Sequence, residues 1–136
     1  MDCIVYCADV IARYGSMNGP FVLIERLGAQ KGFGLPGGKQ EPGELLSETA
    51  RREFLEETGL ALSVTEVFAT CADADRDPRG HFVTTVFIGI AEGDVRDEDG
   101  KTRVHLLAEQ EAFDCRDRFA FDHFLILEKY LKSTRG

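Results

Sequence analysis

Short apolar stretches separated by polar turns run along most of the chain, and they predict a sheet. We predict strands at residues 3–12, 21–26, 60–71, 81–91 and 104–107, because these stretches are short and rich in apolar, β-branched or aromatic residues. We expect the first strand to be central, the first two to form a hairpin across the turn at residues 14–20, and the last to lie at an edge. Residues 92–103 and 109–118 are polar, so we expect a solvent loop and a connection there.

Two further stretches have helical spacing. Residues 45–58 are rich in helix formers, and Gly59 follows them where a helix commonly ends in a left-handed residue. The apolar stripe that should face the core consists of Leu46, Ala50 and Phe54. Residues 119–131 carry apolar side chains at broadly helical spacing and predict a last helix. The order of elements therefore predicts an α/β fold, with a mixed sheet between helices.

Three carboxylates share one face of the first predicted helix. Glu53, Glu56 and Glu57 stand at i, i+3 and i+4, so they are neighbours about one turn deep. Like charges at this spacing repel one another, unless hard divalent cations neutralise them. Mg²⁺ prefers carboxylate oxygens and is often completed by substrate phosphates. A solvated acidic face is the alternative, and this cluster alone leaves it open.

Composition narrows the class of protein. The chain has 136 residues, which suits one domain, and 43% of them are hydrophobic. Its net charge of −8 argues against a general nucleic-acid or membrane-surface binder. The four cysteines lack zinc-site spacing and predict free thiols in a reducing compartment. With no signal peptide or membrane span in the sequence, we expect a cytoplasmic protein.

Some residues suit a phosphate ligand. Glycine is dense in residues 31–38, and it lets a backbone approach a ligand closely. Arg76 and Arg79 precede His81 and give local positive charge, and arginine is well shaped for bidentate phosphate contact. A charged turn is the alternative for this stretch. Arg26, at the end of a predicted strand, can reach a phosphate or remain solvated.

The stretch from Gly38 to Leu60 carries a longer pattern. It reads G-x5-E-x7-R-E-U-x-E-E-x-G-U, where U is apolar, and every fixed position is met. This pattern resembles the signature of the Nudix hydrolases, and residues 33–38 resemble the W-x-L-P-G-G segment before it, with Phe33 in place of tryptophan. The resemblance implies a single Nudix domain over residues 1–136, with an α/β/α sandwich fold. It also implies a pyrophosphohydrolase that uses Mg²⁺, for which Mn²⁺ can substitute.

The same resemblance implies roles for individual residues. Glu53 and Glu57 would be the principal metal ligands, and Glu56 a further ligand or the general base. The Gly38 carbonyl would complete the metal shell, and Arg52 would orient a carboxylate by a salt bridge. Glu44 would support the site. Some family members take the base from outside the signature, and Glu109 and Glu111 are then the candidates in this chain.

The substrate follows from a second resemblance. Residues 76–81 read R-D-P-R-G-H, and residues 120–123 read A-F-D-H. Both resemble the ADP-ribose pyrophosphatase branch of the family, which implies hydrolysis of ADP-ribose to AMP and ribose 5-phosphate. The expected substrate-binding residues are Arg76, Arg79, Phe33 and Arg26. We assign His123 to packing or capping and leave it out of the catalytic set.

Two other functions remain open from the sequence. One is a pyrophosphohydrolase that removes oxidised nucleoside triphosphates from the nucleotide pool. The other is a non-catalytic nucleotide sensor, against which the intact signature counts. In each case the partner is a small-molecule nucleotide, with no nucleic acid and no membrane. The sequence leaves both a monomer and a homodimer open.

Overall fold

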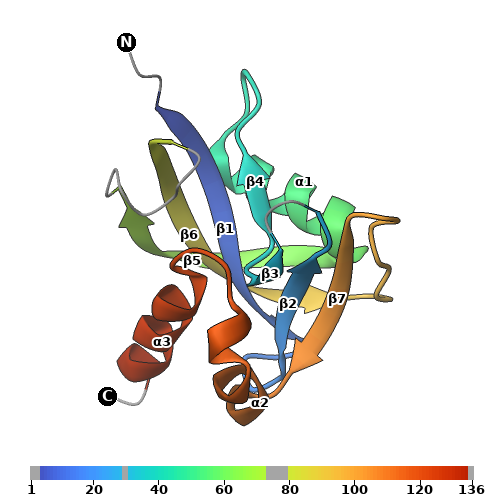
Figure 1. Cartoon of the computed structure of the whole chain (residues 1–136). Helices are drawn as coiled ribbons and strands as arrows, with labels where there is room; N and C mark the ends of the chain where they lie inside the picture. Colours follow the sequence, from blue (N-terminus) through green and yellow to red (C-terminus); the bar gives the residue numbers. More distant parts are fainter. Residues whose placement is uncertain (1–3, 29–30, 73–79, 135–136) are drawn as a thin grey trace.

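Strands from all parts of the chain form one mixed sheet, and helices lie on its two faces (Figure 1). The computed structural model describes residues 4–28, 31–72 and 80–134. The elements are β1 (Val5–Tyr14), β2 (Phe21–Arg26), β3 (Gly32–Gly34), β4 (Gly37–Lys39), α1 (Leu46–Thr58), β5 (Ala61–Cys71), β6 (Phe82–Glu92), β7 (Thr102–Leu107), α2 (Glu109–Asp114), the 3₁₀ turn η1 (Arg116–Arg118) and α3 (His123–Thr134).

β1 is the central strand, as predicted. The sheet order is β3-β2-β1-β6-β5, with β4 paired to β1 and β7 paired to β2. β1 and β6 are parallel, whereas the other pairs are antiparallel. Two strands share the second edge of β1, because β4 pairs with it at Cys7 to Asp9 and β2 pairs with it at Arg13. Arg26, at the far end of β2, thereby comes near β4.

The core lies in two layers, one on each side of the sheet. Ala50 and Phe54 of α1 pack with Val10 of β1 in one cluster. Ile126 and Leu127 of α3 pack with other strand residues in the second cluster, so α1 and α3 cover opposite faces (Figure 1). This arrangement is the predicted α/β/α sandwich. Removing a fully buried ring such as that of Phe54 would cost about 3–5 kcal/mol of folding free energy.

Most predicted elements are present with similar bounds. The helix predicted at residues 45–58 is α1, and the predicted hairpin, edge strand and long strands are β1, β2, β7, β5 and β6. The prediction of one domain over residues 1–136 stays a prediction. In the described part of the chain, no helix combines the length and apolar character needed to cross a membrane.

Two local predictions were wrong, and two short strands were not predicted. The glycine-rich stretch contains these strands, β3 and β4, which form by pairing with β2 and β1. Residues 109–118 form α2 and η1, and the Glu111 carboxylate accepts the Ala108 N–H at 2.8 Å at the start of α2. The last helix begins at His123, because Phe119 bridges to Phe33 and Phe121 has a φ of 54°.

Candidate active site

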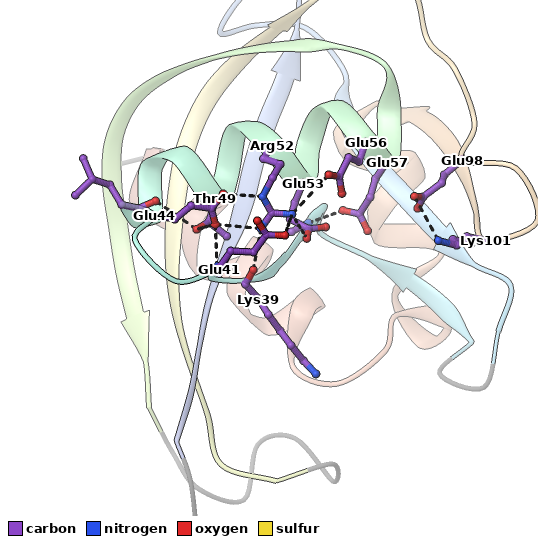
Figure 2. A network of polar contacts seen from close by, with 12 residues as sticks. Lys39, Glu41, Glu44, Thr49, Arg52, Glu53, Glu56, Glu57, Glu98 and Lys101 are labelled. Atoms are coloured by element: carbon purple, nitrogen blue, oxygen red, sulfur yellow. Dashed lines mark hydrogen bonds and ion pairs between the residues drawn. The ribbon is translucent and has the colours of Figure 1, made fainter.

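Helix α1 carries Glu53, Glu56 and Glu57, which we call the carboxylate row. Phe54, on the adjoining side of the helix, is fully buried in the core and so fixes the rotation of α1 that places the row at the edge of that core layer. The helix ends at Gly59, whose φ of 75° is left-handed and whose N–H donates to the Leu55 carbonyl at 2.9 Å. The predicted helix stop is thereby confirmed. Figure 2 shows the row on the same side of α1 as Arg52.

Gly37 and Gly38 of β4 allow the backbone to lie directly against the acidic groups. A Cβ atom at Gly37 would overlap the backbone carbonyl of Ala8 and the carboxylate of Asp9. A Cβ atom at Gly38 would lie 2.7 Å from both carboxylate oxygens of Glu53. The Gly37 N–H donates to Glu57 Oε1 at 2.8 Å. Glycine is therefore required at both positions for close approach, not for a turn.

Arg52 joins one end of the row to the loop before the helix (Figure 2). Its Nε donates to Glu44 Oε2 at 2.6 Å, and its Nη2 donates to Glu44 Oε1 and to the Lys39 carbonyl, each at 3.0 Å. Its Nη1 donates to Glu53 Oε1 at 2.8 Å and lies 3.6 Å from Glu56 Oε1. The hydrogen bonds from Arg52 lower the pKa of Glu44 to about 2, and those to Glu44 raise the pKa of Arg52.

Glu57 lies at the other end of the row and is buried, with a side-chain exposure of 8%. Burial raises its pKa to about 8, although Arg26 and the Gly37 N–H favour the charged form. Arg26 Nη1 donates to Glu57 Oε2 at 3.3 Å. Burial also raises the pKa of Glu53, against the hydrogen bond from Arg52. Both carboxylates therefore favour a nearby cation.

The donors of the row match a hard divalent cation in type. Glu53, Glu56 and Glu57 supply carboxylate oxygens, and the backbone of Gly38 lies against the Glu53 carboxylate. Among the described residues, no three acidic, histidine or cysteine side chains converge as a ready-made metal site. The carboxylates face Arg52 and Arg26 instead. A cation would therefore have to compete with arginine for these ligands.

Glu98 is an acidic neighbour that the sequence analysis missed. It shares a hollow of about 320 Å³ with Glu57 and Arg26, and its charge contributes to the raised pKa of Glu53. The loop is held against the end of α1, because the Arg96 N–H donates to the Thr58 carbonyl at 2.8 Å. The sequence signal was only an acidic run, which is typical of a solvent loop.

The late glutamates predicted as alternative bases lie on α2. Glu111 caps the start of that helix through Ala108. Glu109 lines a groove between α2 and α3 together with Phe113 and Phe124. The structure thus brings Glu98, and not these two residues, to the hollow beside Glu57.

A cavity of about 250 Å³ opens beside β4, and we call it the β4 cavity. It is lined by Cys7, Asp9, Arg26, Gly37, Gly38, Lys39, Phe82, Thr84, Phe121 and His123. His123 is buried, its Nδ1 accepts the Leu35 N–H at 2.9 Å, and its Nε2 lies 3.8 Å from Asp9 Oδ2. The bond to Leu35 places any neutral-ring proton on Nε2. His123 therefore anchors α3 to the loop before β4, consistent with a packing role.

The four predicted substrate-binding residues lie in different surroundings: one lines a cavity, one is buried, and two fall outside the described residues. Arg26 lines the β4 cavity. Phe33 is 3% exposed and packs against His105, with ring centroids 4.9 Å apart, so we assign it to packing rather than to substrate contact. Arg76 and Arg79 lie outside the described residues.

Comparison with known proteins gives a consistent set of relatives. The profile of the NUDIX domain matches residues 6–131. A protein named ADP-ribose pyrophosphatase from Methanocaldococcus jannaschii is 37% identical over 107 residues, which cover 76% of this chain and 60% of that protein. The chain therefore spans less than two thirds of the length of this relative.

Solved structures share the fold. The NUDIX domain of Shewanella oneidensis NrtR, complexed with ADP ribose, has a TM-score of 0.84 and 20% identity, covering 98% of this chain and 90% of that one. A bifunctional NMN adenylyltransferase/ADP ribose pyrophosphatase from Francisella tularensis, complexed with AMP and a Mn ion, has a TM-score of 0.85 and 19% identity. That match covers 98% of this chain and 42% of that one.

Proposed function

This chain belongs to the NUDIX domain family, and from that premise we propose that it is a metal-dependent pyrophosphohydrolase acting on ADP-ribose. It would hydrolyse the diphosphate linkage to give AMP and ribose 5-phosphate. The observation that carries the proposal is the position of the carboxylate row. Glu57 and Glu53 lie against the Gly37–Gly38 backbone beside a cavity large enough for part of a nucleotide.

We assign the metal ligands to the row and its glycine neighbour. Glu53, Glu57 and Glu56, with the Gly38 carbonyl, would hold Mg²⁺ or Mn²⁺. When bound, the metal lowers the pKa of a water and neutralises charge on the diphosphate. Arg52 holds Glu53 in position through its own bonds to Glu44, which limits the movement of that ligand.

The general base would be Glu56 or Glu98. Glu56 has a side-chain exposure of 49% and belongs to the row itself, so it can reach a water at its open side. Glu98 shares a hollow with Glu57. A base must come within hydrogen-bond reach of the water it deprotonates, directly or through one other water. Glu109 and Glu111, the bases predicted from outside the signature, line a groove beside α3 and cap the start of α2, respectively, which favours Glu56 and Glu98 in this proposal.

The substrate assignment has its own support. The M. jannaschii relative carries the name ADP-ribose pyrophosphatase, and an S. oneidensis structure with the same fold was solved with ADP ribose. In this chain, Arg26 in the β4 cavity would bind a phosphate oxygen, and Phe82 and Phe121 supply apolar surface. Arg76 and Arg79 remain proposed phosphate ligands on the basis of the sequence.

A substrate panel tests the proposal. The purified protein is incubated with Mg²⁺ and, separately, with ADP-ribose, other nucleoside diphosphate sugars, nucleoside triphosphates and an oxidised deoxynucleoside triphosphate. Products are identified by ³¹P NMR. We expect AMP and ribose 5-phosphate from ADP-ribose at the highest kcat/KM. Efficient hydrolysis of the oxidised triphosphate with none of ADP-ribose would replace this proposal with the nucleotide-pool function.

Arg79→Ala offers a second test of the substrate. A charge-assisted hydrogen bond to phosphate is worth about 1.5–3 kcal/mol, so kcat/KM for ADP-ribose should fall roughly 10- to 100-fold. The matched control is Arg116→Ala, since Arg116 stacks on Phe113 at α2. Equal kcat/KM values for the two variants would remove Arg79 from the substrate site.

A further inference from the structure

Two arginines contact the carboxylate row, and their surroundings differ. Arg52 bonds to both oxygens of Glu44 and to the Lys39 carbonyl, in addition to Glu53. The Arg26 side chain has one polar contact within the described part of the chain, the ion pair of its Nη1 with Glu57 Oε2 at 3.3 Å. Arg52 is therefore held independently of the row, whereas Arg26 is held by the row itself.

Arg26 also lies between the carboxylates and the open space. It lines the β4 cavity with Gly37 and Gly38, and it lines the hollow that contains Glu57 and Glu98. Its side chain is 23% exposed, so it is neither locked in the core nor fully solvated. A small movement would bring the guanidinium from Glu57 toward a ligand in either space.

The surroundings of Glu57 favour a cation next to its carboxylate. Its Oε1 is fixed by the Gly37 N–H, so only Oε2 depends on Arg26. A buried carboxylate anion without a counter-charge is strongly disfavoured, so the charged form of Glu57 is stable only with a cation facing Oε2. A divalent cation can take the place of the guanidinium there. The displaced guanidinium would then face a cavity, where a phosphate is its best-matched anion.

We propose that Arg26 and a divalent cation exchange on Glu57, and that the released guanidinium binds a phosphate oxygen of the nucleotide. This inference rests on the proposed function in taking the row as the metal site. The exchange couples the two ligands. Metal binding frees Arg26 for phosphate, and phosphate keeps Arg26 from competing for Glu57. Since coupling is reciprocal, each ligand should raise the affinity for the other by the same factor.

The first test measures metal affinity with no nucleotide present. Free Mn²⁺ is titrated by electron paramagnetic resonance into the wild type and into Arg26→Gln, Arg26→Lys and Arg51→Gln. Arg51 is exposed on α1 and adjacent in sequence to Arg52, so its removal controls for the loss of one positive charge on the same helix.

Arg26→Gln should bind Mn²⁺ about tenfold more tightly than the wild type, which corresponds to about 1.4 kcal/mol. Arg51→Gln should change the affinity about twofold or less, because an exposed charge is screened by solvent and salt. Arg26→Lys keeps the competing charge and should stay close to the wild type. Arg26→Gln binding Mn²⁺ no more tightly than Arg51→Gln would overturn the exchange.

The second test measures the coupling. The titration is repeated with saturating AMP, which has no diphosphate to hydrolyse, and the Mn²⁺ bound by AMP itself is subtracted. AMP should raise the Mn²⁺ affinity of the wild type by about fivefold or more, and that of Arg26→Gln much less. Equal coupling in the two proteins would contradict the proposal.

Circular dichroism and the Tm establish that each variant is folded. If Arg26→Gln does not fold, Arg26→Met replaces it, since methionine is also uncharged and adapts to irregular space. Failure of the substrate proposal gives a different result. In that case ADP-ribose is not hydrolysed, while Arg26→Gln still binds Mn²⁺ more tightly than Arg51→Gln.

Discussion

The two ends of the carboxylate row place the same residue type in opposite environments. At the Arg52 end, Glu44 is saturated with hydrogen bonds and its pKa falls to about 2. At the Arg26 end, Glu57 is buried and its pKa rises to about 8. The first carboxylate is stable as an anion without any ligand, whereas the second gains from a cation. We therefore propose that the Arg52 end maintains the shape of the site and that the Arg26 end exchanges its cation.

Among the variants that test this difference, Glu57→Gln should cause the largest loss of activity. It keeps the size of the side chain and removes a charged ligand, so kcat for ADP-ribose should fall at least ~10²-fold at saturating Mg²⁺. The metal-free Tm should hold or rise, because the substitution removes a carboxyl group whose charged form is disfavoured by burial. Steady-state kinetics and calorimetry check both parts. Near wild-type turnover would exclude Glu57 as a metal ligand.

Removal of the general base should have the next largest effect on activity. Removing it should lower kcat by about 10²–10⁴-fold with little change in KM. We expect that loss in either Glu56→Gln or Glu98→Gln, and the larger loss that persists at saturating Mg²⁺ with unchanged metal affinity identifies the base. Glu109→Gln and Glu111→Gln are matched controls on α2 and should remain within about threefold of the wild type. A dominant loss in one of these controls would contradict the assignment to the row and its neighbour.

Arg52→Lys should have an intermediate effect. Lysine keeps the charge, but its single nitrogen cannot reproduce the hydrogen bonds that the planar guanidinium of Arg52 makes to both Glu44 oxygens, Glu53 and the Lys39 carbonyl. Loss of an outer contact that orients a metal ligand commonly costs about 10- to 100-fold in metal affinity or activity. We expect a loss of that size in the Mg²⁺ concentration dependence of kcat/KM. An effect as large as that of Glu57→Gln would show that the two ends do not differ in role.

We expect the smallest effect from Glu44→Gln, which should change the stability of the fold at acid pH through the Arg52 end of the row. The folded pKa of Glu44, about 2, lies below the ordinary glutamate pKa of 4.5, so its stabilisation is present above pH 4.5 and is lost as the pH falls toward 2. Glu44→Gln should therefore flatten this part of the Tm profile between pH 6 and pH 2. An unchanged acid profile would mean that the bonds to Arg52 do not stabilise the fold.

The local sequence pattern predicted the helices and strands whose conformation depends mainly on residues near them in the chain. Helix α1, its stop at Gly59 and the strands β5 and β6 follow from periodicity and from one glycine. The three carboxylates follow from helix geometry alone, since i, i+3 and i+4 lie on one face. The pattern did not predict β3 or β4, which are three residues each and exist through pairing with β2 and β1.

The sequence pattern did not predict contacts between residues that are distant in the chain. Arg26 and Glu57 are separated by 31 positions, and nothing in the strand or the helix predicts that they pair. Glu98 belonged to a run that is typical of a solvent loop, and only the packing of that loop against the end of α1 brings it near Glu53. Phe33 was predicted to bind substrate because it stands where the resembled family segment has tryptophan, but its neighbours bury it.

The most direct test of the account is a crystal structure with Mn²⁺ and AMP, using anomalous scattering to locate the metal. We expect an anomalous peak within bonding distance of Glu57 and Glu53, with Arg26 moved from Glu57 to the AMP phosphate. A peak elsewhere, or a structure with both ligands bound in which the Arg26–Glu57 contact remains at 3.3 Å, would contradict it.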